Sequence, residues 1–243
     1  MNATNKKGSL YLIPTTLGEV GPLEVLPLSI KRTVESINHY IAENEKSARA
    51  FIKKLSPGKS QNKLDIQLIN KYTNAMELPS YLNPCLEGHD VGVISDAGCP
   101  GVADPGAEVV KIAHEKDITV VPLVGPSSIL LALMASGMNG QNFAFNGYLP
   151  IESQVRRLEI KNLERRSKDL DQTQIFIETP YRNDKMLESL VQTLNKNTLL
   201  CVACDITLPT EFIKTQPVSF WSHYNIDLHK RPCIFLIYEP PLK

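Results

Sequence analysis

Short apolar runs alternate with amphipathic stretches along the first half of the chain. Five runs have the length and apolar character of strands: residues 10–13, 39–42, 65–70, 91–94 and 119–124. Three stretches between them space their apolar side chains as a helix packed on a core does: residues 27–37, 47–55 and 107–114. The pattern predicts strands that alternate with helices.

The same alternation begins again after a strongly apolar helix predicted over residues 129–136. Four further strands are expected at residues 143–147, 173–178, 198–203 and 233–238. Two further helices are expected over residues 153–170, which are highly charged, and 184–194. The second half of the chain therefore repeats the organisation of the first.

Alternation of strands and helices favours an α/β fold, because a parallel strand pair needs a long crossover that is usually a helix. We expect an amino-terminal α/β domain over residues 1–125 and a carboxy-terminal α/β domain over residues 143–243. A connecting helix and linker is expected over residues 126–142. A chain of 243 residues is long enough for two such domains.

The composition narrows the class of protein. The chain is 42% hydrophobic, yet no segment approaches the roughly 20 apolar residues of a membrane helix, so no membrane partner is expected. The start of the chain is polar and carries no secretory signal, and the cysteines number five, so a cytoplasmic location is expected. The 26 basic residues balance the 26 acidic ones, which argues against extensive electrostatic wrapping of nucleic acid.

The most informative segment is the loop Ser-Asp-Ala-Gly-Cys-Pro-Gly-Val-Ala-Asp-Pro-Gly at residues 95–106, directly after the strand at 91–94. Loops also follow two other strands, at residues 14–18 and 125–128. The carboxyl ends of parallel strands share one edge, where open sheets bind ligands. We therefore expect the three loops to line one pocket.

Three polar residues of these loops are candidate ligand contacts. Asp96 can accept hydrogen bonds from an amine or from hydroxyl groups, and Ser127 and Ser128 offer hydroxyls and free N–H groups at a helix start. Taken singly, the serines are ordinary helix caps and Asp96 an ordinary turn residue. The combination of three loops favours a binding site.

Other sites are less well supported. No strand end carries the glycine pattern of a dinucleotide or triphosphate site. The pair Cys201 and Cys204 has a metal-site spacing but lies in an apolar strand without a second pair, so core packing is expected and no metal.

Basic residues are concentrated in two segments. Residues 46–63 contain six basic residues and no acidic one: Lys46, Arg49, Lys53, Lys54, Lys59 and Lys63. A second cluster over residues 156–168 is interrupted by glutamates and is interpreted as a solvated helix face. The first cluster suggests a partner that carries phosphate groups, with a solvated face as the alternative.

Taken in order, these segments resemble the tetrapyrrole methylase superfamily of S-adenosylmethionine (SAM)-dependent methyltransferases. Within it the chain is most similar to the ribosomal RNA small subunit methyltransferase I family, which methylates a cytidine ribose 2′-oxygen of 16S ribosomal RNA. The matching segments cover most of the chain: residues 8–18, 95–106, 121–128, 145–150, 176–182 and 205–211.

The resemblance implies two α/β domains, with a mainly parallel first sheet, a mixed second sheet and the cofactor SAM in a cleft between the domains. It also implies a homodimer and an RNA or ribosomal-subunit substrate. The cofactor contacts that it implies come from both domains: Leu17, Asp96, Cys99, Ser127, Ser128, Ile177, Ala203, Leu208 and Pro232. The RNA contacts expected from the basic cluster are Lys46, Arg49, Lys53 and Lys54.

The chain departs from the family after its second strand. The family carries Glu-Asp-Thr-Arg-x-Thr there, and this chain has Glu-Asn-Glu-Lys-Ser-Ala at residues 43–48. Lysine lacks the bidentate fork with which arginine grips phosphate, so RNA binding is expected to differ or to be lost. Methylation of a small molecule such as a tetrapyrrole, and a SAM-binding paralogue without catalysis, are therefore alternatives.

A ribose hydroxyl is a poor nucleophile that gains from a nearby base. Three residues after the second strand are candidates for this role, and the sequence does not choose among them: Glu43, Glu45 and Lys46.

Overall fold

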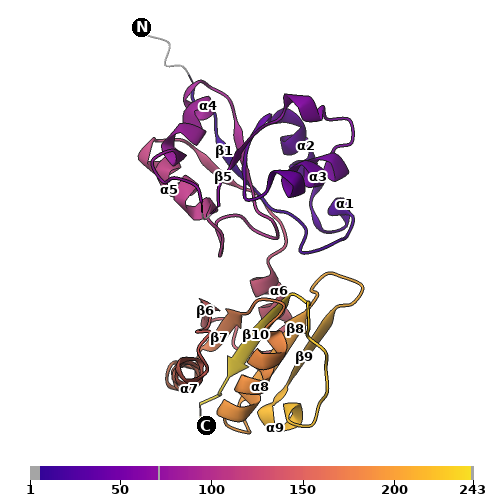
Figure 1. Cartoon of the computed structure of the whole chain (residues 1–243), viewed down its shortest axis with the longest axis vertical. Coiled ribbons are helices and arrows are strands. Elements are labelled where there is room, and N and C mark those ends of the chain that lie inside the picture. The colour runs from indigo at the N-terminus through magenta and orange to yellow at the C-terminus, as the bar shows by residue number, and fades with distance from the viewer. Residues whose placement is uncertain (1–5, 71, 242–243) are drawn as a thin grey trace. The chain divides into compact units, whose positions relative to one another are not determined.

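The computed structural model describes residues 6–70 and 72–241 of the chain (Figure 1). Most of the polar amino-terminal stretch, in which the sequence predicts no secretory signal, lies outside these residues. The chain divides into two compact units, with the boundary between Ser127 and Ser128. Among the described residues, no helix is both long and apolar enough to cross a membrane.

The first unit is built on a parallel sheet of five strands in the order β3-β2-β4-β1-β5. The strands are β1 (Leu10–Ile13), β2 (His39–Ala42), β3 (Asp65–Leu68), β4 (Val91–Ile94) and β5 (Val120–Pro122). All five were expected from the sequence, and their parallel pairing confirms the predicted class of the first half.

Helices cover both faces of this sheet. On one face lie α1 (Pro22–Val25), α2 (Leu28–Ser36) and α3 (Glu45–Leu55), and on the other α4 (Asn83–Leu86) and α5 (Gly106–Glu115) (Figure 1). Two 3₁₀ helices, η1 (Gln61–Lys63) and η2 (Leu78–Leu82), lie in the connections. The short α1, α4 and 3₁₀ helices have too few residues for a periodic pattern, and the sequence did not predict them.

Each face of the sheet has its own core, because successive residues of a strand point to opposite sides. In β2, Tyr40 packs with residues of α2 and α3, whereas Ile41 packs with residues of α4 and α5. The Tyr40 hydroxyl donates to the carbonyl oxygens of Val34 and Ile37, 2.9 and 3.0 Å away, and burial raises its pKa. The hydroxyl thereby satisfies the carboxyl-terminal carbonyls of α2 inside the core.

The strand order creates a topological switch point between β1 and β4. The chain leaves β1 toward α1 and α2 on one face, and it leaves the neighbouring β4 toward α5 on the other face. Adjacent connections that diverge in this way leave a crevice at the carboxyl ends of the strands, where open α/β sheets bind ligands. The switch point locates the candidate site.

The second unit has a mixed sheet in the order β6-β7-β10-β8-β9, in which only β6 and β7 are parallel. Its strands are β6 (Phe143–Tyr148), β7 (Thr173–Ile177), β8 (Leu199–Cys204), β9 (Phe212–Pro217) and β10 (Cys233–Tyr238). Its helices are α6 (Ser128–Ser136), α7 (Ser153–Leu170), α8 (Asn183–Thr193) and α9 (Val218–Trp221). The mixed sheet is the one that the family resemblance implies.

The edge strand β9 was not among the predicted elements. It is half-buried along its whole length, it carries Lys214 and Gln216 among its apolar residues, and it ends at Pro217. Proline is tolerated there because an edge strand needs fewer ladder hydrogen bonds. Such a strand gives a weak sequence signal.

The cysteines of β8 pack in the core, as the sequence predicted. Cys204 lies opposite Cys233 in the core formed with α7 and α8, whereas Cys201 is buried on the other face of the sheet. Burial raises the pKa of the Cys201 thiol to about 11. Residues three apart in a strand face opposite sides, so Cys201 and Cys204 cannot share one metal ion.

Candidate functional site

The three loops that follow β1, β4 and β5 meet at the carboxyl edge of the first sheet. The backbone N–H of Thr15 donates to the carbonyl oxygen of Gly98 at 3.0 Å, which joins the β1 and β4 loops. The Cys99 thiol donates to the carbonyl oxygen of Pro126 at 3.4 Å, which joins the β4 and β5 loops. The loops therefore lie together, as predicted, although the β5 loop does not line the pocket beside Asp96.

Glycines allow this close approach. Gly98 has a φ of +74°, and a Cβ there would lie 3.1 Å from Leu17 Cδ2 and 3.3 Å from the Pro126 carbonyl oxygen. A Cβ on Gly125 would lie only 2.3 Å from Cγ of the rigid Pro14 ring. Gly98 also needs glycine for its positive φ, and Gly125 needs it because the Pro14 ring from another loop packs directly against it.

Replacing Gly125 with alanine is expected to lower the free energy of unfolding by about 1–3 kcal/mol, because the Pro14 ring and the β5 loop must separate to admit the methyl group. Urea unfolding followed by circular dichroism measures this change. The matched control is Gly58→Ala, because a Cβ at Gly58 would meet no described atom within 4 Å. Equal stability of the two variants would contradict the tight contact.

The loop over residues 95–106 is held by its own hydrogen bonds. Asp104 Oδ1 accepts from the backbone N–H groups of Gly101 and Gly106, both at 2.7 Å, and the Ser95 hydroxyl donates to the Gly98 carbonyl at 2.8 Å. Burial raises the pKa of the Asp104 carboxyl although these two donors oppose the shift. Asp104 therefore shapes the loop.

Asp96, by contrast, is exposed, and its carboxylate makes no hydrogen bond or ion pair with any described residue. It lies directly after β4, at the switch point. Leu17 lies half-buried in the β1 loop beside Gly98, and Ser127 and Ser128 are half-buried at the start of α6. Cys99 is half-buried, burial raises the pKa of its thiol, and the thiol bonds backbone carbonyls.

The three candidate bases after β2 have different surroundings. Glu43 is half-buried, and its Oε1 accepts from the backbone N–H of Asp96 at 3.4 Å. Burial is the main cause that raises the pKa of the Glu43 carboxyl, and the negative charges of Asp104 and Asp96 add to it. Glu45 is instead paired with Arg49 at 2.8 Å, and Lys46 is exposed without a described ion partner.

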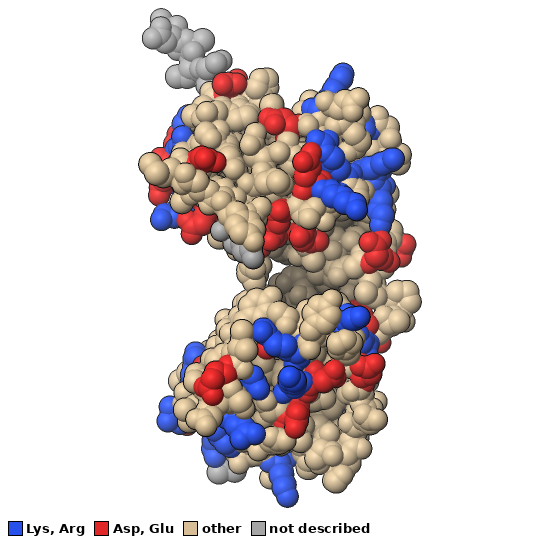
Figure 2. Space-filling view, in the orientation of Figure 1, with Lys and Arg blue, Asp and Glu red and all other residues tan. Residues whose placement is uncertain are grey.

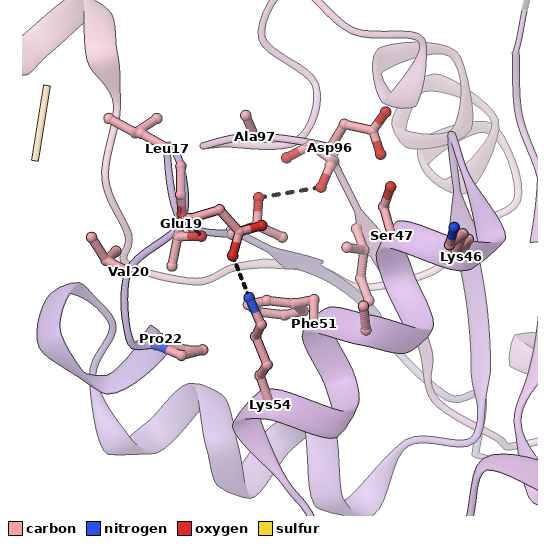
Figure 3. Close-up of a pocket in the computed structure, with 16 residues that line it drawn as sticks. Leu17, Glu19, Val20, Pro22, Lys46, Ser47, Phe51, Lys54, Asp96 and Ala97 are labelled. Atoms are coloured by element: carbon pink, nitrogen blue, oxygen red, sulfur yellow. Dashed lines mark hydrogen bonds and ion pairs between the residues drawn. The ribbon is translucent and has the colours of Figure 1, made fainter. Parts of the chain in front are cut away.

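A pocket of about 370 Å³ opens beside Asp96 in the first unit (Figure 3). Its walls are the β1 loop, one face of α3 and the start of the β4 loop. Sequence reasoning named Leu17, Asp96, Lys46 and Lys54 among its lining residues. The loops 14–18 and 95–106 were also expected at a pocket. The residues that the sequence did not single out come from α3, from the segment after residue 18 and from the end of β4: Glu19, Val20, Pro22, Ser47, Ala50, Phe51 and Ile94.

The basic cluster of the first unit is only partly free for a ligand. Lys and Arg side chains gather over the part of this unit that carries α2 and α3 (Figure 2). Arg49 bonds Glu45 and the carbonyl oxygens of Gln61 and Leu64, and Lys54 pairs with Glu19 at 2.5 Å. Lys46 and Lys53 are exposed and have no described ion partner.

The candidate residues of the second unit lie at one edge of its sheet. Ile177 of β7 and Ala203 of β8 flank Ile234 in the same cross-strand row. The Asp205 N–H donates to the Pro232 carbonyl at 3.0 Å, and the Leu208 N–H donates to the Asp205 carbonyl at 2.9 Å. The structure therefore brings all four residues together: Ile177, Ala203, Leu208 and Pro232.

Two ion pairs that the sequence did not single out brace this edge. Glu178, buried directly after β7, accepts from Arg182 Nη2 at 2.6 Å and from the Thr179 N–H at the same distance. Asp205 Oδ2 accepts from Arg231 Nε at 2.8 Å and from the Thr210 hydroxyl at 2.9 Å. Asp205 and Arg231 are 26 residues apart and give no local pattern from which to predict their pair, whereas Glu178 and Arg182 are only four residues apart.

No family model matches the chain. Curated relatives do match most of it. The chain is 27% identical over 243 residues to ribosomal RNA small subunit methyltransferase I of Buchnera aphidicola subsp. Schizaphis graminum, covering 98% of this chain and 81% of the relative. It is 30% identical over 219 residues to the enzyme of the same name from Escherichia coli O157:H7, covering 89% of this chain and 72% of the relative.

Solved structures share the fold. The methyltransferase CobJ matches with a TM-score of 0.62 at 15% identity, covering 96% of this chain and 94% of that one. Uroporphyrin-III-C-methyltransferase from Thermus thermophilus matches with a TM-score of 0.54 at 18% identity, covering 95% and 92%. These likenesses confirm the tetrapyrrole methylase fold that the sequence resemblance predicted. With the identity to its curated relatives, they lead to one conclusion: the chain belongs to the ribosomal RNA small subunit methyltransferase I family of methyltransferases.

Proposed function

We propose that the protein transfers a methyl group from SAM to a ribose 2′-oxygen of small-subunit ribosomal RNA. The observation that carries this proposal is the switch point of the first sheet, where the unpartnered Asp96 carboxylate lies beside Glu43. Its relatives are named for methylation of this RNA. The family resemblance also predicts a homodimer, and the polar start of the chain and its five cysteines predict a cytoplasmic location; both features remain part of the proposal.

The residues at the carboxyl edge suit SAM. An exposed carboxylate without a protein partner, such as Asp96, can accept hydrogen bonds from ligand hydroxyl or ammonium groups. Gly98 lets the β1 and β5 loops pack closely beside it, and Leu17 adds an apolar contact. Cys99 and Ser127 complete the proposed contacts of this unit, and Ser128, the first residue of the second unit, is a further proposed contact. The others proposed for the second unit are Ile177, Ala203, Leu208 and Pro232.

When bound, SAM supplies an electrophilic methyl group on a sulfonium, so the protein mainly has to orient the acceptor and accept its proton. Glu43 is the proposed base. Its Oε1 accepts from Asp96 N–H, which leaves Oε2 for the proton of the ribose hydroxyl. Its raised pKa makes the carboxylate a stronger base than an ordinary glutamate. Glu45 is less suitable because Arg49 occupies its carboxylate.

RNA contacts are proposed for the same side of the unit. Lys46 and Lys53 are the members of the basic cluster best able to neutralise phosphates, because they are exposed and lack described ion partners. Arg49 and Lys54 would have to exchange existing partners first. Lys46 stands where the family carries arginine, so it provides a point charge in place of a bidentate fork.

Isothermal calorimetry tests the cofactor. SAM and S-adenosylhomocysteine are expected to bind with affinities at least about tenfold above those of ATP and NAD, because no strand end carries a dinucleotide or triphosphate pattern. No heat from either SAM or S-adenosylhomocysteine at millimolar concentration would overturn the proposed function.

A further inference from the structure

We propose that the pocket between the β1 loop and α3 receives one unstacked nucleotide of the RNA acceptor, with its base inside the pocket. This inference rests on the proposed function and adds the site at which the acceptor binds. The pocket lies wholly within the first unit, and Asp96 forms part of its rim (Figure 3).

The lining matches the surface of a nucleobase, which has apolar faces and a polar edge. Val20, Pro22 and Phe51 supply apolar wall, and Phe51 is 8% exposed. Thr16 and Ser47 supply hydroxyl groups that can bond the base edge or the sugar. Aromatic and apolar side chains that flank an extruded base, with polar groups at its edge, are how proteins bind a flipped nucleotide.

The size of the pocket favours a nucleotide over a tetrapyrrole. A volume of about 370 Å³ lies near the lower end of ordinary ligand pockets, which is suited to one base and sugar. A tetrapyrrole has four linked rings, and its acidic members carry many carboxylates. The lysines of the pocket, Lys46 and Lys54, balance the charges of Asp96 and Glu19, so it is size and not charge that disfavours a tetrapyrrole.

The position of Lys46 is suited to binding a phosphate of the RNA backbone. Lys46 lines this pocket and also an adjoining shallow groove with Glu43, Asn70 and Leu68. It therefore lies on the ridge between the two hollows, exposed and without a described ion partner. A phosphate on this ridge would hold one nucleotide in the pocket and its neighbour in the groove, beside the proposed base Glu43.

Away from Lys46, an exposed ion pair spans the mouth of the pocket. Lys54 Nζ lies 2.5 Å from Glu19 Oε2, which ties the β1 loop to α3 next to Phe51 (Figure 3). A pocket enclosed between a loop and a helix has no room for a stacked, paired base. The acceptor is therefore expected in a single-stranded or locally opened segment of the RNA.

Two substitutions fill the pocket without entering the core. Ala50 and Ser47 are exposed, line the pocket and lie three residues apart on one face of α3. Ala50→Trp and Ser47→Trp are each expected to lower kcat/KM for methylation of small ribosomal subunits by about 100-fold, since a displaced acceptor loses its alignment. The Kd for SAM is expected to stay within about twofold, because Ser47 and Ala50 lie on α3 and are not among the proposed cofactor contacts.

The matched control is Ser29→Trp, an equally bulky change at an exposed residue of α2 that does not line the pocket. Circular dichroism and Tm establish that the variants are folded. Because two positions in the pocket are tested, the experiment still gives a result if one of the two variants fails to fold.

Wild-type kcat/KM in both folded pocket variants would overturn the pocket assignment while leaving the methyltransferase function intact. Loss of SAM binding in both would also overturn it, by assigning the pocket to the cofactor. A wild-type protein that neither binds SAM nor methylates RNA would instead refute the proposed function.

Discussion

Replacing Glu43 with glutamine is expected to lower kcat for methyl transfer by about 100-fold or more, the loss typical of removing a general base. Glutamine keeps the size of the side chain and can still accept from the Asp96 N–H, but it cannot take the proton of a ribose hydroxyl. The Kd for SAM is expected to change little. Single-turnover methylation with saturating SAM measures the effect.

The raised pKa of Glu43 also leads to a prediction of how kcat depends on pH. Because burial and the charges of Asp104 and Asp96 raise its pKa, kcat of the wild type should rise with pH through that raised value and then level off. This rise of kcat with pH should be absent in Glu43→Gln. A control at an exposed glutamate of α5, Glu108→Gln, should keep it. Wild-type kcat in Glu43→Gln would exclude Glu43 as the base.

The same raised pKa has a consequence for stability. A carboxyl with a raised folded-state pKa stabilises the fold below its unfolded pKa, 4.5, and loses that contribution as pH rises through the folded value. Glu43→Gln should therefore raise Tm at pH 7 and leave it unchanged well below pH 4.5. Thermal unfolding at the two pH values separates this effect from catalysis, and a lower Tm at pH 7 would contradict it.

Replacing Asp96 with alanine is expected to raise the Kd for SAM by about 10- to 100-fold, which corresponds to the loss of a hydrogen bond to a charged group. Stability should hardly change, because the Asp96 carboxylate bonds no described residue. Calorimetry with the purified variant measures the Kd.

The control for this variant lies at the other end of the same strand. Asp90 Oδ1 accepts from the Ser9 N–H at 2.8 Å, at the amino edge of the sheet. Asp90→Ala should lower the free energy of unfolding and leave the Kd for SAM unchanged in the folded protein. If the Kd for SAM is unchanged in Asp96→Ala, or if it rises equally in Asp96→Ala and Asp90→Ala, Asp96 is not part of the proposed site.

The switch-point loops could be predicted from the sequence because each lies directly after an apolar strand and is rich in glycine and proline. The carboxyl ends of parallel strands must share an edge, so the meeting of residues 14–18 and 95–106 followed from the fold class alone. The Thr15–Gly98 hydrogen bond shows how closely they approach.

Side-chain pairing could not be predicted in the same way. The basic residues 46–63 form one cluster in the sequence, yet Arg49 is tied to Gln61 and Leu64, and Lys54 to Glu19. Only the packing of α3 against its neighbours separates these two from the unpartnered Lys46. The choice among the candidate bases likewise depended on Glu43 meeting Asp96, 53 residues further along the chain.

The most direct test of the proposed function is methyl transfer from tritiated SAM to purified small ribosomal subunits that lack the modification. Nuclease digestion and nucleoside analysis then locate the label. We predict stoichiometric label in 2′-O-methylcytidine from 16S ribosomal RNA. Subunits that stay unlabelled while calorimetry detects SAM binding would contradict RNA methylation and favour a small-molecule acceptor or a non-catalytic paralogue.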